Sequence, residues 1–107
     1  MAERPHSTRM CAKFQTAADL VAKRWTPLVV QLLLKKPHRY SELVNELEVV
    51  TEGMLSQRLK ELEGAGIVER RVIDCQPVRV EYRLTDKGRA LGRVIGGLER
   101  WAEEWIR

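Results

Sequence analysis

The run from Thr51 to Gly66 constrains the fold of this chain most, because it has the start, the stop and the periodicity of one amphipathic helix. Thr51 can cap the helix, since its hydroxyl can accept a hydrogen bond from a free backbone amide of the first turn. Gly64 and Gly66 can end it, because glycine adopts a left-handed backbone conformation at little cost. At about 100° per residue, the leucines fall on one narrow stripe: Leu55, Leu59 and Leu62. The stripe predicts a buried face, and the remaining positions predict a polar, exposed face.

Two strand-like segments follow this helix directly and are separated by a short turn. Residues 67–73 and 78–84 are rich in β-branched residues, and residues 74–77 have the composition of a turn. An amphipathic helix alone is ordinary, since most surface helices of globular domains have this pattern. A helix that leads at once into a basic hairpin is the layout of a winged helix, whose helix enters the DNA major groove while its hairpin contacts the backbone or the minor groove. We therefore predict a DNA-binding protein.

Length and composition limit the classes of protein that this chain can form. With 107 residues it has the length of one domain, and its formal net charge of +4 favours a polyanionic partner. No apolar run is long enough to cross a bilayer and no apolar signal core follows the first residues, so we expect a cytoplasmic protein. Two cysteines and two histidines lie far apart without zinc spacing, so we expect thiols, no metal and no other cofactor.

The first part of the chain predicts an arm and then a helix. Residues 1–10 are polar and aperiodic, so we expect a flexible arm until Ser7 or Thr8 caps the next helix. Apolar residues then recur at helical spacing between Cys11 and Ala22, which indicates a first amphipathic helix.

Two more helices are expected before the Thr51 helix. Thr26–Pro27 is a strong start signal, with threonine as the cap and proline at the first helical position, and the apolar block 28–34 belongs in the middle of the core. The segment 40–47 predicts a short helix, which completes a helix-turn-helix with the Thr51 helix.

The last helix has features of a dimer interface. Thr85–Asp86 predicts its start, with an acid at the positive end of the helix. Its glycines weaken it by up to about 1 kcal/mol each relative to alanine: Gly88, Gly92, Gly96 and Gly97. A closely packed partner helix would compensate, so we expect a homodimer through this helix and the first one. The expected interface residues include large apolar anchors: Phe14, Leu98, Trp101 and Trp105. Alternatively, the tryptophans pack only on the core of their own domain and form no dimer interface.

Four motifs along the chain resemble those of the HxlR-type transcriptional regulators, a winged-helix family. They are Lys23-Arg24-Trp25, Arg39-Tyr40-Ser41-Glu42-Leu43, Arg58-Leu59-Lys60-Glu61-Leu62-Glu63 and Pro77-Val78-Arg79-Val80-Glu81-Tyr82-Arg83-Leu84-Thr85. The resemblance extends from Cys11 to Trp101. It implies an α+β, mostly helical winged helix-turn-helix in residues 11–107, forming a dimeric bacterial or archaeal DNA-binding regulator with dimerisation helices at both ends.

Within that family, the chain is most similar to the thiol-sensing, YodB-like branch of repressors of quinone and disulfide stress genes. Cys11 lies fourteen positions before Trp25, where that branch carries its sensing cysteine. Two positions differ: Ala12 stands where the family usually has proline, and Gly53 where it often has lysine.

The DNA contacts are expected on the exposed side of the Thr51 helix and on the hairpin. Ser56 and Gln57 project from the N-terminal half of the helix, and an amide that both donates and accepts makes Gln57 the best base contact. Lys60 and Arg39 suit phosphates, whereas Arg58 can contact DNA or lay its stem over the core. Arg79 is the wing arginine, and the other wing arginines have acidic neighbours. The expected DNA-binding residues are Arg39, Thr51, Ser56, Gln57, Arg58, Lys60 and Arg79.

Cys11 is the candidate sensor. It lies near a helix start with Arg9 and Lys13 close in sequence, and both the helix end and the cations favour a thiolate. In the alternative, it is a small apolar residue on the helix stripe. Cys75 lies in the predicted wing turn and is either a resolving thiol or without a role.

The leading hypothesis is a dimeric repressor that leaves a palindromic operator when a quinone or an oxidant attacks Cys11. A second is a regulator of the same fold controlled by a small molecule between the first and last helices. A third is a protein-interaction module that uses a winged helix without DNA. Neither His6 nor His38 has a context that would make it a base for Cys11, so we expect no enzyme.

Overall fold

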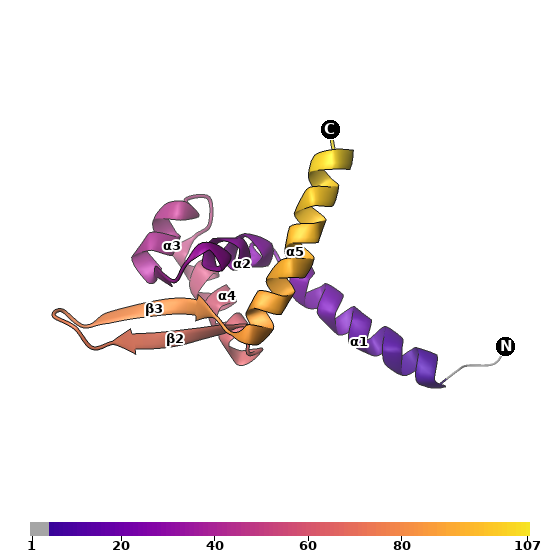
Figure 1. Cartoon of the computed structure of the whole chain (residues 1–107), viewed down its shortest axis with the longest axis horizontal. Helices are drawn as coiled ribbons and strands as arrows, with labels where there is room; N and C mark the ends of the chain where they lie inside the picture. The colour runs from indigo at the N-terminus through magenta and orange to yellow at the C-terminus, as the bar shows by residue number, and fades with distance from the viewer. Residues whose placement is uncertain (1–4) are drawn as a thin grey trace.

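The chain folds as a winged helix with long helices at both ends, as the sequence predicts (Figure 1). The computed structural model describes the backbone of residues 5–107 and the side chains of residues 12–107. The elements in chain order are α1 (Pro5–Ala22), α2 (Thr26–Lys35), β1 (His38–Arg39), α3 (Tyr40–Glu46), α4 (Glu52–Gly64), β2 (Val68–Ile73), β3 (Arg79–Leu84) and α5 (Asp86–Trp105). None of the helices in these ranges is long and apolar enough to span a membrane.

The core lies between α2, α3, α4, the base of the hairpin and the inner face of α5, where Ile95 is 2% exposed. The predicted stripe of α4 is buried, with Leu55, Leu59 and Leu62 each at most 2% exposed. The apolar block of α2 is only partly central, because Leu28 and Leu34 are 41% and 43% exposed. A ten-residue helix turns nearly three times, so its apolar residues cannot all face one core.

Helix α4 starts and stops as predicted. The Thr51 hydroxyl accepts a hydrogen bond from the Met54 amide at 3.2 Å. Gly66 has a φ of 76°, and the following Ile67 amide donates to the Leu62 carbonyl at 2.9 Å. This exit turns the chain directly from the helix into β2.

The start of α2 differs from the prediction. Its cap is Trp25 in a left-handed conformation, with a φ of 76°, and not the Thr26 hydroxyl. The turn is closed by the backbone, since the Thr26 amide donates to the Lys23 carbonyl at 3.1 Å. Trp25 packs against the core, so tertiary packing decides this conformation. Pro27 does lie in the first turn of the helix.

The sheet contains a strand that the sequence pattern did not reveal. β1 has only two residues, too few to show alternation, and it pairs antiparallel with β3 through His38 opposite Tyr82. The strand order is β1-β3-β2, and β2 pairs with β3 from Val68 opposite Leu84 outward to the wing. His38 is buried, and its Nδ1 donates to the Lys36 carbonyl at 2.8 Å.

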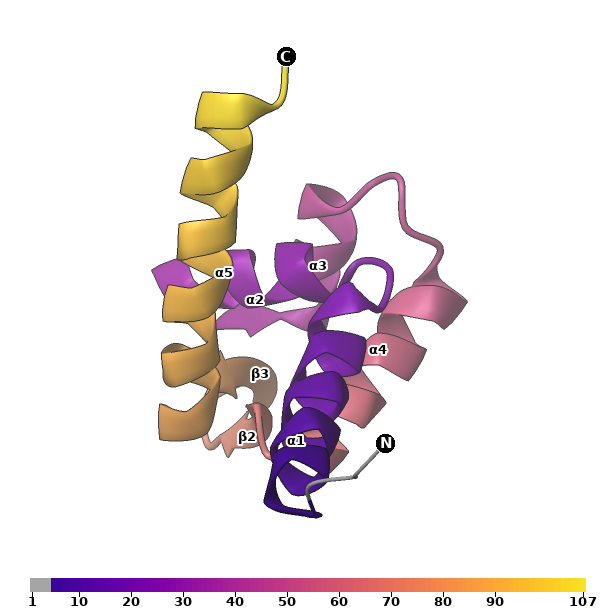
Figure 2. The same cartoon turned by 90° about the vertical axis from the view of Figure 1, so that its right-hand side faces the viewer.

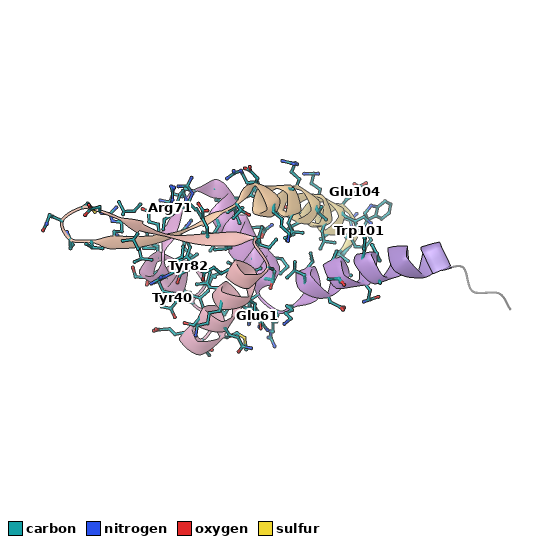
Figure 3. The ribbon with its side chains drawn as sticks, turned by 90° about the horizontal axis from the view of Figure 1, so that it is seen from below. Tyr40, Glu61, Arg71, Tyr82, Trp101 and Glu104 are labelled. Carbon is teal, nitrogen blue, oxygen red and sulfur yellow. The ribbon has the colours of Figure 1, made fainter. Side chains whose placement is uncertain are left out.

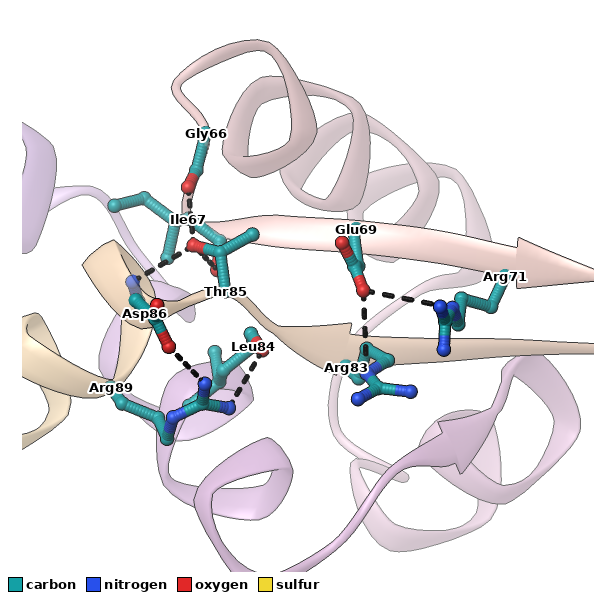
Figure 4. Close-up of polar contacts among 10 residues, drawn as sticks. Gly66, Ile67, Glu69, Arg71, Arg83, Leu84, Thr85, Asp86 and Arg89 are labelled. Atoms are coloured by element: carbon teal, nitrogen blue, oxygen red, sulfur yellow. Dashed lines mark hydrogen bonds and ion pairs between the residues drawn. The ribbon is translucent and has the colours of Figure 1, made fainter.

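Helix α5 is capped as predicted, but two of its glycines have a role within the chain. The Thr85 hydroxyl accepts from the Gly88 amide at 3.0 Å and donates to the Gly66 carbonyl at 2.5 Å (Figure 4). The Thr85 amide donates to the Ile67 carbonyl at 3.0 Å, which joins the start of α5 to the residue before β2. A Cβ at Gly88 would lie 2.1 Å from that carbonyl oxygen, and one at Gly92 would lie 2.0 Å from a Leu34 methyl. The chain's own close packing therefore explains Gly88 and Gly92, whereas a partner helix was expected to do so.

Helix α1 begins at Pro5, earlier than expected. The arm predicted for residues 1–10 is therefore too long, because proline lacks only an amide that has no helical partner in a first turn. Residues 1–4 lie outside the described part of the chain. In Figure 1, α1 and α5 extend away from the body in different directions, and in the view of Figure 2 α1 points toward the viewer, in front of the body.

Candidate nucleic-acid interface

The outward face of α4 is open and polar. Gln57 and Lys60 are exposed, and the Gln57 amide donates to a Glu61 carboxylate oxygen at 3.4 Å. Gly53, at the start of the helix, has no neighbouring atom within 4 Å of the place where a Cβ would be. The buried leucines hold this helix from one side, so a duplex could approach it from the other.

Tyr40 fixes the N-terminal end of α4 against α3, which sequence reasoning did not anticipate. Its hydroxyl donates to the Glu52 carbonyl at 3.1 Å and lies 3.1 Å from the Ser56 hydroxyl. Because the tyrosine proton goes to Glu52, Ser56 donates to the tyrosine oxygen. Ser56 is thus half-buried and engaged within the protein. Figure 3 shows Tyr40 on the side of the molecule where α4 lies.

Arg39 lies where β1 ends and α3 begins. Its amide donates to a Glu42 carboxylate oxygen at 2.8 Å, and its guanidinium is 3.6 Å from the other oxygen. The hydrogen bond from the Arg39 amide is the main reason that the pKa of Glu42 is lowered. Burial opposes this effect, and the Arg39, Lys36 and His38 charges lower the pKa further. The Arg39 side chain is half-exposed, so the guanidinium can exchange this surface pair for a phosphate at little cost.

The wing carries arginines and acids on one face of β2 and β3. Glu69 lies between two arginines, 3.3 Å from Arg83 and 3.8 Å from Arg71 (Figure 4). Arg79, at the outer end of β3, is 4.0 Å from Glu81. These exposed pairs are weak, so the acids reduce the positive field of the wing without fixing its arginines.

Arg58 is directed into the protein. Its side chain is only 12% exposed, its Nε donates to the Arg24 carbonyl at 2.8 Å, and its Nη1 lies 3.0 Å from Glu61. Of the two roles considered from the sequence, these contacts favour packing. Arg24 lies in the turn between α1 and α2, 34 positions away in the chain, where no local sequence pattern would reveal it.

The terminal helices leave large apolar side chains uncovered. Phe14 of α1 is 74% exposed, and Trp101 and Trp105 of α5 are 54% and 63% exposed. We call the exposed residues Val94, Leu98, Trp101 and Trp105 the outer stripe of α5. Figure 3 shows Trp101 on the side of the molecule away from the wing. The exposure excludes the alternative in which these tryptophans cover the domain's own core.

A cavity of about 420 Å³ lies beside this stripe, between α1 and α5. Its walls are largely apolar and include Leu20, Ile67, Leu91 and Val94, with Lys13 and Lys87 at its edge. The volume is within the range of small-molecule sites, about 300–1,000 Å³.

The two cysteines lie at opposite ends of the molecule. Cys11 belongs to α1, and its side chain is outside the described residues. Cys75 lies in the turn between β2 and β3, half-buried, with its thiol 3.1 Å from the Pro77 carbonyl. In the described side chains, no group of three histidine, cysteine or acidic residues could hold a metal ion.

Comparison with known proteins agrees with this geometry. A family model described as HxlR-like helix-turn-helix matches residues 20–107. The chain belongs to this HxlR-like family. Its relatives in Bacillus subtilis include the HTH-type transcriptional regulators YvaP, 46% identical over 94% of both chains, and YodB, 41% identical over 90% of this chain and 86% of YodB. The protein is accordingly a DNA-binding transcriptional regulator of the helix-turn-helix class and not an enzyme.

Solved structures show the same fold. The reduced form of YodB from B. subtilis superimposes with a TM-score of 0.82 at 39% identity, covering 89% of this chain and 93% of YodB. The redox regulator HypR in its oxidised form gives a TM-score of 0.81 at 28% identity, covering 89% of this chain and 98% of HypR. YodB is also known in diamide-treated and quinone-bound forms.

Proposed function

We propose that this HxlR-like regulator is a dimeric repressor that binds a palindromic operator through α4 and the wing. The observation that carries the proposal is the division of α4 into a buried leucine face and an open face with Gln57 and Lys60. Gln57 would contact a base edge, while Lys60, Arg39 and Arg79 would contact phosphates. Thr51 would set the start of the helix, and Ser56 would approach the bases only if it left Tyr40.

The outer stripe of α5 supports the dimer. Contiguous large apolar residues on a surface helix cost free energy in water and mark association sites. A second copy of the chain would cover Trp101, Trp105, Leu98 and Phe14 symmetrically, and two copies would place two α4 helices on successive major grooves.

Cys11 is the proposed switch, because α1 adjoins the same surface through the α1–α5 cavity. The thiolate would add to a quinone ring, forming a carbon–sulfur bond while the ring takes up a proton and becomes a substituted hydroquinone. Diamide would instead oxidise Cys11 and a second thiol to a disulfide, gaining their two hydrogens. Either change adds bulk or a crosslink at α1. The dimer would then change the spacing of its two α4 helices and lose one half-site.

The test is to titrate the wild type, Cys11→Ser and Cys75→Ser with diamide and with a benzoquinone while following operator binding. The wild type and Cys75→Ser should be released, and Cys11→Ser should stay bound. Release of Cys11→Ser at the wild-type reagent concentration would contradict the proposed switch, and release that depends on Cys75 alone would move it to the wing.

A second candidate function is control by a small apolar ligand, which the cavity between α1 and α5 favours. In that case, excess electrophile would release none of the three proteins. Leu91→Trp, which would fill the cavity, would then abolish the response to the ligand while operator binding persisted.

A further inference from the structure

We infer that Arg58 and Glu61 couple the end of α1 to α4, so that a change in α1 reaches the DNA-reading helix through this contact. The inference rests on the proposed function, because it concerns how α1 controls α4. We call Lys23, Arg24, Arg58 and Glu61 the α1–α4 clamp.

The clamp consists of three polar contacts, of which two cross from α4 to the turn after α1 and one lies within α4. Arg58 Nε donates to the Arg24 carbonyl at 2.8 Å, and its Nη1 is 3.0 Å from Glu61 Oε1. Lys23 Nζ is 3.4 Å from the same Glu61 oxygen. One carboxylate thus joins a cation of the turn to a cation of its own helix. Arg58 adds a bond to the turn's backbone, and hydrogen bonds from charged donors are stronger than neutral ones.

Glu61 stays ionised in this arrangement. Burial would raise its pKa, but the Gln57 amide and the Lys23 and Arg58 charges outweigh that effect, so the pKa is lowered. The acceptor for both cations is therefore present at neutral pH.

The turn itself is held in one conformation. Trp25 has a left-handed φ of 76°, which is unfavourable for a residue with a side chain and persists only where the surroundings determine it. The indole packs against the core, the Arg24 guanidinium lies 4.8 Å from the centre of its ring, and the next residue, Thr26, is buried. A displacement of the turn would therefore move the Arg24 carbonyl as a unit with α1.

Helix α1 is anchored mainly at this end. Residues 12–17 are all exposed, whereas Leu20 and Val21 near the C-terminus are half-buried against the core. A force on α1, such as bulk at Cys11 or repacking against a second copy, thus acts on the turn. Arg58, which contacts the turn, is the residue directly after Gln57 on α4.

The inference distinguishes Arg58 from a DNA contact through the salt dependence of binding. Losing one phosphate contact lowers the slope of log affinity against log salt by about 0.9. Arg58→Met keeps the apolar stem and removes the donors, so operator affinity should keep the wild-type slope. The matched variant Lys60→Met, on the exposed face of the same helix, should show the reduced slope. A fall of about 0.9 for Arg58→Met would make Arg58 a phosphate contact and overturn the inference.

Amide hydrogen exchange without DNA or electrophile tests the clamp separately from the proposed function. The Thr26 amide, bonded to the Lys23 carbonyl, should exchange about tenfold faster in Arg58→Met, because one charge-assisted bond is lost. Glu61→Gln should also increase the exchange rate of the Thr26 amide. The control Glu63→Gln, at an exposed position of α4, should leave that rate unchanged. Unchanged Thr26 exchange in both clamp variants would overturn the inference, even if operator binding proceeds as proposed.

The last arm measures coupling directly. If diamide releases the wild type from its operator, the ratio of operator affinities before and after treatment should be several-fold smaller for Arg58→Met than for the wild type. The ratio for Glu63→Gln should equal that of the wild type. An unchanged ratio for Arg58→Met would overturn the coupling. If diamide does not release the wild type, the thiol switch fails and the exchange result alone decides the clamp. If Arg58→Met does not fold by circular dichroism, Arg58→Gln, which removes the charge and Nε but keeps a polar side chain, replaces it in all three arms.

Discussion

The surfaces proposed for DNA binding and for dimerisation differ in how their apolar residues are covered. The leucine face of α4 is completed within the chain, with Leu59 and Leu62 buried against α2, α3 and the hairpin base. The outer stripe of α5 has no such cover, and Leu98 and Trp101 are about half exposed. A single chain can therefore fold and present α4, and it also buries the inner face of α5 at Ile95, whereas the outer stripe can be covered only by something outside the chain. In the proposed function, DNA reading and assembly would thus use separate apolar surfaces, and the turn after α1 would join them.

The largest effect that tests this comparison is on folding. Leu59→Ala should lower the free energy of unfolding by about 2–5 kcal/mol, because it leaves a cavity in a packed core. Leu98→Ala removes the same atoms from an exposed position and should leave the unfolding of the monomer nearly unchanged. Chemical denaturation at low protein concentration measures both. Equal losses would mean that the outer stripe of α5 belongs to the core of the single chain.

The second effect is on assembly. Trp101→Ala should weaken the dimer by about 2 kcal/mol or more, as expected for a large apolar anchor, and sedimentation at low micromolar concentration should show monomers. Circular dichroism should remain that of the wild type, because the indole does not contribute to the core. A fully dimeric Trp101→Ala protein would assign the outer stripe another role.

The smallest effect concerns the glycines of α5. Gly96→Ala should stabilise the helix by up to about 1 kcal/mol, since its Cβ would meet only an Arg100 nitrogen at 3.7 Å. Gly88→Ala should destabilise the fold, because the Ile67 carbonyl occupies that space. Thermal unfolding compares the two. Loss of the dimer in Gly96→Ala would instead show that a partner helix packs closely on this glycine.

The sequence predicted the features that depend on residues close to one another in the chain. The Thr51 cap, the leucine stripe, the exit at Gly66 and the Thr85 cap each depend on a few neighbouring residues, and each is present in the structure. The start of α2 was wrong in detail, because Trp25 takes its conformation from contacts with the core and not from the Thr26–Pro27 signal.

Features that join distant parts of the chain could not be predicted in the same way. The two residues of β1 carry no alternation, and only the pairing with β3 makes them a strand. Tyr40 reaches Ser56 across 16 positions and Arg58 reaches Arg24 across 34. Position on α4 predicted DNA contacts for Ser56, Gln57 and Lys60 and left Arg58 open between DNA contact and packing. The fold engages Ser56 and Arg58 within the protein and leaves Gln57 and Lys60 exposed.

The central claim is that the open face of α4 reads DNA sequence, and selection from a pool of random duplexes tests it most directly. The wild type should enrich one palindromic site and bind it about 10³-fold or more tightly than scrambled DNA at the same salt concentration. Gln57→Ala should lose about 1–3 kcal/mol of discrimination at one base pair in each half-site, while Lys60→Ala should weaken all sequences alike. If no site is enriched, or if Gln57→Ala selects the wild-type site with unchanged discrimination, α4 is not the reading helix that this account requires.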